Sequence, residues 1–174
     1  MLFAHIHAPL SASEQVRSAD ALGRVTAEEV LAPHPLPEFP RSTMDGYAVS
    51  AADTFGASES LPAYLALKGE VPMGQAPRFS VGRGECALIH TGGMMPPGTN
   101  AVVMLEFTQK VERGGTHSTD IEILKPAAEG ENTFRIGEDA SAGSVLIPKG
   151  QILRPAELGG LAAVGILDLR VVTK

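Results

Sequence analysis

The sequence predicts a β-rich α+β protein, and three features of the chain support this class. Nineteen glycines and thirteen prolines among 174 residues divide it into many short elements, which favours strands and turns over a helical bundle. Short runs rich in Val, Ile, Leu and Ala fill the middle of the chain, each bounded by turn-forming residues. A helical pattern is clearest near the C-terminal end.

Composition excludes several classes of protein. The net charge is −6 and no basic run is long enough to follow a phosphate backbone, so nucleic acid is not expected as a partner. Cys86 is the single cysteine, which leaves no disulfide framework and no thiolate zinc site, and we expect it in the core. No apolar run approaches the ~18 residues of a membrane span, and residues 1–7 do not resemble a signal peptide. We therefore expect a cytoplasmic protein.

The N-terminal segment, residues 11–32, predicts a helix. Ser11 and Glu14 have capping-box spacing, and apolar residues recur at steps of three and four up to Gly23, a natural stop. Val16 is the only bulky apolar residue in the first half, so a helix of one or two turns is the alternative. The four prolines between residues 33 and 40 then exclude a helix and predict an extended connector at a domain boundary.

A small β domain is predicted from this connector to about residue 135. Its candidate strands are short and closely spaced, which indicates a barrel or sandwich rather than a parallel sheet with crossover helices. The strands are residues 47–49, 63–68, 85–90, 101–106, 108–112 and 121–125. Residues 113–115 predict a hairpin turn.

The last forty residues have a different pattern. Residues 143–150 predict a strand and a turn. A helix is expected over residues 155–164, with proline at its first position and Gly165 at its end. Residues 166–172 then predict a final strand.

Three stretches of the chain are similar to known motifs. Residues 42–49, STMDGYAV, are similar to a segment that usually ends SAMDGYAV. Residues 90–106 begin with His90 and continue with a stretch similar to TGAPLPxGADAVVMQE. Residues 132–139 are similar to NIRRxGED. The three occur in order with suitable spacing. The chain therefore resembles the molybdopterin molybdenumtransferases, the MoeA and gephyrin E-domain family, over roughly residues 18–174.

The resemblance implies a particular domain organisation. Family members have an elongated, discontinuous α/β domain, here residues 1–35 and 136–174, which serves linkage and dimerisation. A small β-barrel-like domain, here residues 36–135, is inserted into it. The resemblance also favours a short helix near residues 18–23. The pterin-binding domain of the family is not part of this sequence.

Asp45 is the first candidate for chemistry. It precedes Gly46, which permits a tight turn and close approach to a ligand, and a carboxylate there could hold Mg²⁺. An Asx-turn, with the side chain bonded to its own backbone two residues on, is the alternative. The resemblance implies a functional Asp at this position.

Thr91 follows an apolar strand and precedes Gly92 and Gly93. A hydroxyl with free amides at a strand end can receive an oxyanion such as phosphate or molybdate. A structural threonine in a strand-to-loop turn is the alternative. The resemblance implies that Thr91 lies at the active site.

Acidic residues 138 and 139 are adjacent, so their side chains diverge and do not form an acid–base pair. The resemblance implies that Asp139 is a functional carboxylate, with a solvated pair that caps a turn as the alternative. Glu106 stands at the position of a family acid, with a surface charge as the alternative. Histidines 5, 7, 34, 90 and 117 are scattered, and we expect most to be surface or satisfied residues.

Arg135 is the basic residue beside this acidic pair, and a guanidinium binds phosphate or molybdate oxygens well. The family usually has further basic residues here, where this chain has Phe134 and Ile136. Asn100 also replaces a family Asp, and Leu105 a family Gln. These departures weaken the expected anion contact.

The resemblance implies an activity, the insertion of molybdate into adenylylated molybdopterin. It implies Asp45, Thr91 and Asp139 as catalytic residues, with Mg²⁺ held by the two aspartates. Gly46, Gly92, Arg135 and Glu106 would contact the substrate. The family acts as a homodimer, so this chain would supply half a site in trans. Two hypotheses remain open beside this one: a non-catalytic dimerisation or docking scaffold, and a small β-barrel module that binds an anion.

Overall fold

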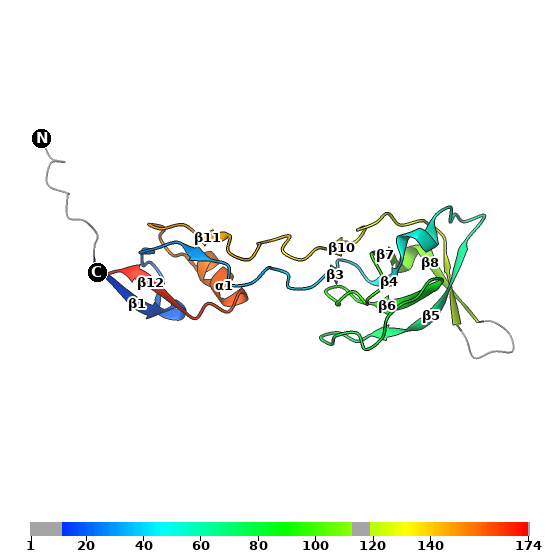
Figure 1. The fold of residues 1–174 in the computed structure, drawn as a ribbon, viewed down its shortest axis with the longest axis horizontal. Helices are drawn as coiled ribbons and strands as arrows, with labels where there is room; N and C mark the ends of the chain where they lie inside the picture. Colours follow the sequence, from blue (N-terminus) through cyan, green and yellow to red (C-terminus); the bar gives the residue numbers. More distant parts are fainter. Residues whose placement is uncertain (1–11, 113–118, 174) are drawn as a thin grey trace, which may run out of the picture. The chain divides into compact units, whose positions relative to one another are not determined.

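The computed structural model describes residues 12–112 and 119–173, which divide into two compact units (Figure 1). Unit 1 contains the described residues up to Leu36 and from Asp139 onward. Unit 2 contains those between Pro37 and Glu138. The resemblance placed these boundaries at 35/36 and 135/136, and the linker and dimerisation role it gives to unit 1 stays a prediction.

Unit 2 is built on one curled, six-stranded sheet with the strand order β7-β4-β6-β5-β9-β8 (Figure 1). Neighbouring strands are antiparallel except β5 and β6, which run parallel. The strands are β4 (Gly46–Val49), β5 (Ala63–Val71), β6 (Glu85–Ile89), β7 (Ala101–Met104), β8 (Thr108–Glu112) and β9 (Thr119–Ile123). Two 3-10 helices, Ala51–Thr54 and Leu105–Phe107, and a short pair, β3 (Arg41–Ser42) with β10 (Thr133–Phe134), complete it.

The core of unit 2 covers both faces of the central strands. Successive side chains of a strand point to opposite faces, and β4 is buried throughout. Tyr47 and Val49 belong to one apolar cluster with the fully buried Cys86, whereas Ala48 belongs to a second cluster with Ile89. The sheet therefore holds β4 and the residues at its ends firmly in place.

Unit 1 joins two distant parts of the chain. Strand β1 (Ser13–Arg17) pairs antiparallel with β12 (Asp168–Val172), and β2 (Val30–Leu31) pairs with β11 (Val145–Ile147). Helix α1 (Pro155–Ala163) packs onto them through the buried Leu161. No helix in residues 12–112 or 119–173 is long and apolar enough to cross a membrane.

The predicted elements of unit 2 are confirmed to within a few residues, as are the C-terminal helix and strand. The protein is β-rich, and α1 is the only α-helix in the described ranges. The helix predicted from residue 11 is wrong in the described part. That segment forms β1 and then one 3-10 turn, Ser18–Asp20, because its backbone pairs with β12 at the other end of the chain. Ser11 and the turn at residues 113–115 lie outside the described residues.

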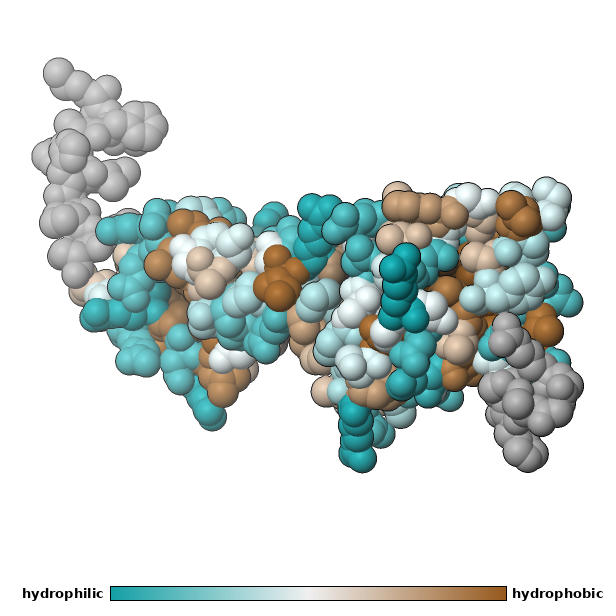
Figure 2. All heavy atoms as spheres, turned by 45° about the vertical axis from the view of Figure 1, so that its right-hand side comes forward, coloured by the Kyte–Doolittle hydropathy of each residue, from teal (hydrophilic) through white to brown (hydrophobic). Residues whose placement is uncertain are grey.

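The surface in Figure 2 is mixed, with hydrophobic residues in separate brown patches among hydrophilic ones. Large exposed hydrophobic side chains occur in both units, for example Leu22 and Leu167 in unit 1 and Phe55 and Leu61 in unit 2. Scattered exposed apolar residues are normal for a folded protein and do not by themselves mark a binding face.

Candidate functional site

The candidate site lies at one edge of the unit 2 sheet, where β4 begins and β5, β6 and β7 end. Strands β5 and β6 run parallel, so both end at this edge, and the antiparallel β4 begins there. Asp45 immediately precedes β4, Glu70 lies near the end of β5, and His90 and Thr91 follow β6. The mixed sheet thus brings together residues that are up to 46 positions apart.

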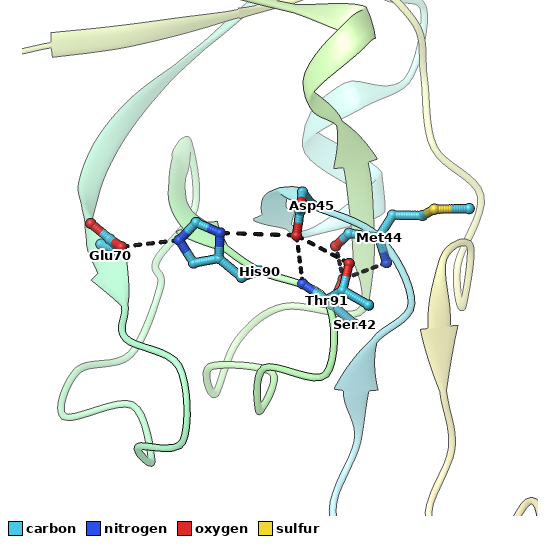
Figure 3. A network of polar contacts seen from close by, with 6 residues as sticks. All are labelled: Ser42, Met44, Asp45, Glu70, His90 and Thr91. Atoms are coloured by element: carbon cyan, nitrogen blue, oxygen red, sulfur yellow. Dashed lines mark hydrogen bonds and ion pairs between the residues drawn. The ribbon is translucent and has the colours of Figure 1, made fainter.

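The Asp45 carboxylate is held through one of its two oxygens, Oδ1. The Thr91 backbone amide donates to Oδ1 at 2.7 Å, and the Thr91 hydroxyl donates to the same oxygen at 3.0 Å (Figure 3). Within the described chain, the hydrogen bonds and ion pairs of this side chain all fall on Oδ1. With 57% of the side chain exposed, Oδ2 is open to solvent or a ligand.

The same contacts hold the pKa of Asp45 below its ordinary value. The backbone hydrogen bond from Thr91 is the main cause, followed by the Thr91 hydroxyl; desolvation opposes them, and His90 lowers the pKa by less than either hydrogen bond. Asp45 is therefore an ionised carboxylate at neutral pH, fixed at one oxygen and exposed at the other.

The Asx-turn considered for Asp45 is not formed. Ser42 makes the local turn in its place, since its hydroxyl donates to the Met44 carbonyl and accepts from the Met44 amide (Figure 3). The Asp45 side chain binds Thr91 instead.

The free amides expected after β6 are not free. The amide of Thr91 donates to Asp45, that of Gly92 donates to the Ser42 carbonyl at 2.8 Å, and that of Gly93 donates to the His90 carbonyl at 2.8 Å. An oxyanion nest needs unpaired amides. The position that an external anion would occupy at Thr91 is taken by the Asp45 carboxylate.

The local backbone structure requires glycine at both predicted glycine positions, Gly46 and Gly92. A β-carbon at Gly46 would lie 2.1 Å from the Val103 carbonyl oxygen, so the close approach of β4 and β7 requires glycine there. Gly92 has φ +81°, which side chains rarely adopt, and forms the turn after Thr91. Substrate contact by either glycine stays a prediction.

His90 and Glu70 extend the site along the sheet edge, and the sequence did not single them out. His90 Nε2 lies 3.0 Å from Glu70 Oε1, and Nδ1 lies 3.9 Å from Asp45 Oδ1 (Figure 3). The ring thus stands between two carboxylates. Only the register of the parallel pair β5–β6 could have indicated this contact, because nothing in the sequence around Glu70 marks it.

Asp139 belongs to unit 1, whereas Asp45 and Thr91 belong to unit 2. The Asp139 backbone amide donates to the Leu36 carbonyl at 2.9 Å, and the residue lines a cavity of about 330 Å³ beside α1, together with Glu157. Glu138 accepts a hydrogen bond from the Arg135 amide, which matches the turn-capping alternative for that residue. Across the described ranges, no group of three His, Cys, Asp or Glu side chains is arranged to hold a metal.

The other predicted contacts lie in unit 2. Glu106 is exposed in the 3-10 helix after β7, and the amide of its neighbour Leu105 donates to the Asp45 carbonyl at 3.2 Å. Arg135 lines an open hollow of about 690 Å³ with Phe134 and Ile136 among its walls. Asn100 borders this hollow too, and its Oδ1 accepts from the Ala51 amide at 2.8 Å, a contact that a carboxylate could make equally well.

The chain is similar to proteins of known family over most of its length. The family model described as the MoeA N-terminal region, domains I and II, matches residues 2–165. The chain belongs to the MoeA N-terminal family. It is 40% identical over 158 residues to a putative molybdopterin biosynthesis protein of Methanocaldococcus jannaschii, covering 91% of this chain and 36% of that protein. It is 36% identical over 162 residues to the molybdopterin molybdenumtransferase of Bacillus subtilis, covering 93% of this chain and 37% of that protein.

A solved MoeA structure shares the fold. The molybdopterin biosynthesis MoeA protein of Pyrococcus horikoshii matches with a TM-score of 0.85 and 38% identity, covering 94% of this chain and 41% of that one. This MoeA N-terminal region therefore spans well under half the length of these relatives.

The donor set at the sheet edge of this MoeA N-terminal region fits Mg²⁺ in a limited way. Mg²⁺ is commonly bound through one or two carboxylates, with water and substrate phosphate as its other ligands. Oδ2 of Asp45 offers one such oxygen, ionised and exposed. The Thr91 hydroxyl donates its one hydrogen to Oδ1, which leaves its oxygen lone pairs available to a cation.

Proposed function

We propose that this chain acts as the N-terminal region of a molybdopterin molybdenumtransferase, which inserts molybdate into adenylylated molybdopterin during molybdenum cofactor biosynthesis. The names of its relatives support this activity. The structural observation that supports it most is the Asp45 carboxylate, because one oxygen is fixed by Thr91 and the other is exposed at the sheet edge. Catalytic groups are commonly ionised side chains held in one geometry by a neighbour.

Each residue has a separate role in this proposal. Asp45 and Asp139 are each proposed as a carboxylate ligand for Mg²⁺, which when bound would neutralise phosphate charges of the substrate. Thr91 orients Asp45 through two hydrogen bonds to Oδ1. Arg135 binds substrate oxygens from the wall of its hollow, and Glu106, Gly46 and Gly92 border the substrate.

The proposal includes a division of labour between subunits. The enzyme is a cytoplasmic homodimer, and this region contributes half a site that the pterin-binding domain of the other subunit completes. Unit 1 is the discontinuous linker and dimerisation domain, and unit 2 is the domain inserted into it. The limited donor set around Asp45 supports a shared site, since one exposed carboxylate does not enclose a ligand.

The isolated chain tests this division. Incubated with adenylylated molybdopterin, Mg²⁺ and molybdate, the 174-residue chain should release no AMP above the rate without protein. AMP release by the isolated chain at a rate comparable to that of a complete relative would contradict the shared site.

A further inference from the structure

The contact between Glu70 and His90 joins the ends of two parallel strands. An ionised carboxylate only accepts hydrogen bonds, so Nε2 of His90 carries the proton and donates to Glu70 Oε1 at 3.0 Å. Both residues are partly exposed, with 33% of the His90 side chain and 55% of the Glu70 side chain accessible. The contact therefore does not bury the ring, and we expect its effect to be on the position of the ring.

The segment that carries the ring also carries the donors to Asp45. Thr91 follows His90 directly, and its amide and hydroxyl both bind Asp45 Oδ1. Gly92 and Gly93 come next, and their amides donate to the Ser42 and His90 carbonyls at 2.8 Å. The chain thus leaves strand β6 and turns at the residue on which the Asp45 contacts depend.

We infer that Glu70 and His90 form a positioning pair that holds the end of β6 against Asp45 and so keeps Oδ2 turned toward a ligand. Glu70 acts through His90, and His90 acts through its chain neighbour Thr91. The inference rests on the proposed function of Asp45 and adds two residues to that site. Neither of them touches the ligand.

Amide hydrogen exchange of Thr91 in the full chain tests the pair. Glu70→Ala should speed exchange of the Thr91 amide by about three- to tenfold, roughly the factor that one net hydrogen bond is worth. Glu70→Gln should stay within about twofold of the unmodified chain, because its side-chain oxygen still accepts from Nε2–H. The Tyr47 amide, in the middle of the same sheet, reports whether a variant has loosened the whole unit.

A matched control removes the same charge elsewhere. Glu59 is exposed in unit 2, so Glu59→Ala should leave Thr91 exchange unchanged. Unchanged exchange in Glu70→Ala would overturn the inference. Equal acceleration in Glu70→Ala and Glu70→Gln would also overturn it, because the effect would then follow charge rather than the hydrogen bond.

Manganese separates this inference from the proposed function. Mn²⁺ added to the full chain as a probe for Mg²⁺ should broaden the Thr91 and Gly46 amide signals, and Asp45→Asn should abolish the effect. Glu70→Ala should weaken Mn²⁺ binding by about threefold or more, since outer groups that orient a ligating carboxylate commonly change metal affinity by about 10- to 100-fold. Broadening that persists in Asp45→Asn would contradict the metal role of Asp45, while Thr91 exchange would still decide whether the pair positions this segment.

Discussion

The Thr91 backbone amide lies 2.7 Å from Oδ1 of Asp45, and the Thr91 hydroxyl lies 3.0 Å from the same oxygen. Two donors from one residue thus hold one oxygen of a carboxylate 46 positions earlier in the chain. This arrangement turns a surface aspartate into an oriented, ionised group. It also uses the Thr91 amide, while the Gly92 and Gly93 amides donate to backbone carbonyls, so none of the three is unpaired.

Thr91→Val should raise the pKa of Asp45 toward its ordinary value. The change removes the hydroxyl donor but keeps the backbone donor and the branched shape, so part of the lowering should remain. A carboxyl-carbon NMR titration of Asp45 measures this directly. Thr91→Ser keeps both donors and should titrate like the unmodified chain, and a Val variant that also does so would contradict the assigned role of the hydroxyl.

The same hydrogen bonds predict the direction of acid sensitivity. The folded-state pKa of Asp45 is lowered, so its stabilising contribution is complete above the ordinary aspartate pKa and is lost as pH falls through the folded value. Asp45→Asn should therefore reduce the loss of unit 2 stability below the ordinary pKa of aspartate. Urea unfolding at a series of acidic pH values, followed by NMR signals of unit 2, measures the change. An identical acid dependence in both proteins would contradict it.

Gly46→Ala should strongly destabilise unit 2. The added β-carbon would lie 2.1 Å from the Val103 carbonyl oxygen, so β4 and β7 would have to separate. Overpacking costs about 1–3 kcal/mol in most cores, and we expect a loss near the upper end of this range. Urea unfolding followed by NMR signals of unit 2 gives the difference. Gly69→Ala in β5 is the control, because its β-carbon would meet Phe79 at an ordinary contact distance of 3.4 Å.

Gly159→Ala should stabilise unit 1. Gly159 lies inside α1 with nothing within 4 Å of an added β-carbon, and alanine is favoured over glycine by about 1 kcal/mol in a helix. Gly165→Ala should do the opposite. Gly165 has φ +71° just after the helix, where its amide and that of Ile166 donate back to the Ala162 and Leu161 carbonyls in a Schellman motif. Equal effects of the two changes on urea unfolding of unit 1 would contradict this account.

Sequence patterns predicted unit 2 well because its strands are marked locally. Each is a short apolar run between turn residues, and Gly46 and Gly92 lie at a close strand approach and a tight turn. The N-terminal segment could not be predicted in this way. Residues 13–17 carry no strong local preference, and they form a strand because β12 is available as a partner about 150 residues later.

The candidate site was predictable only in part for the same reason. Asp45 and Thr91 lie in recognisable motifs, although their direct contact did not follow from them. Glu70 and His90 come together through the one parallel strand pair of an otherwise antiparallel sheet. A pairing of that kind depends on the whole sheet, so no local pattern at either residue indicates it.

Complementation in a host that lacks its own molybdopterin molybdenumtransferase tests the central claim most directly. The matching region of the Bacillus subtilis enzyme would be replaced by residues 12–172 of this chain, with and without Asp45→Asn, and protein abundance would be measured in parallel. The account predicts that the chimera with Asp45 restores molybdoenzyme activity and that Asp45→Asn lowers it at least about tenfold, the scale of losing one oriented charged group. Full activity of the Asp45→Asn chimera at equal abundance would contradict it.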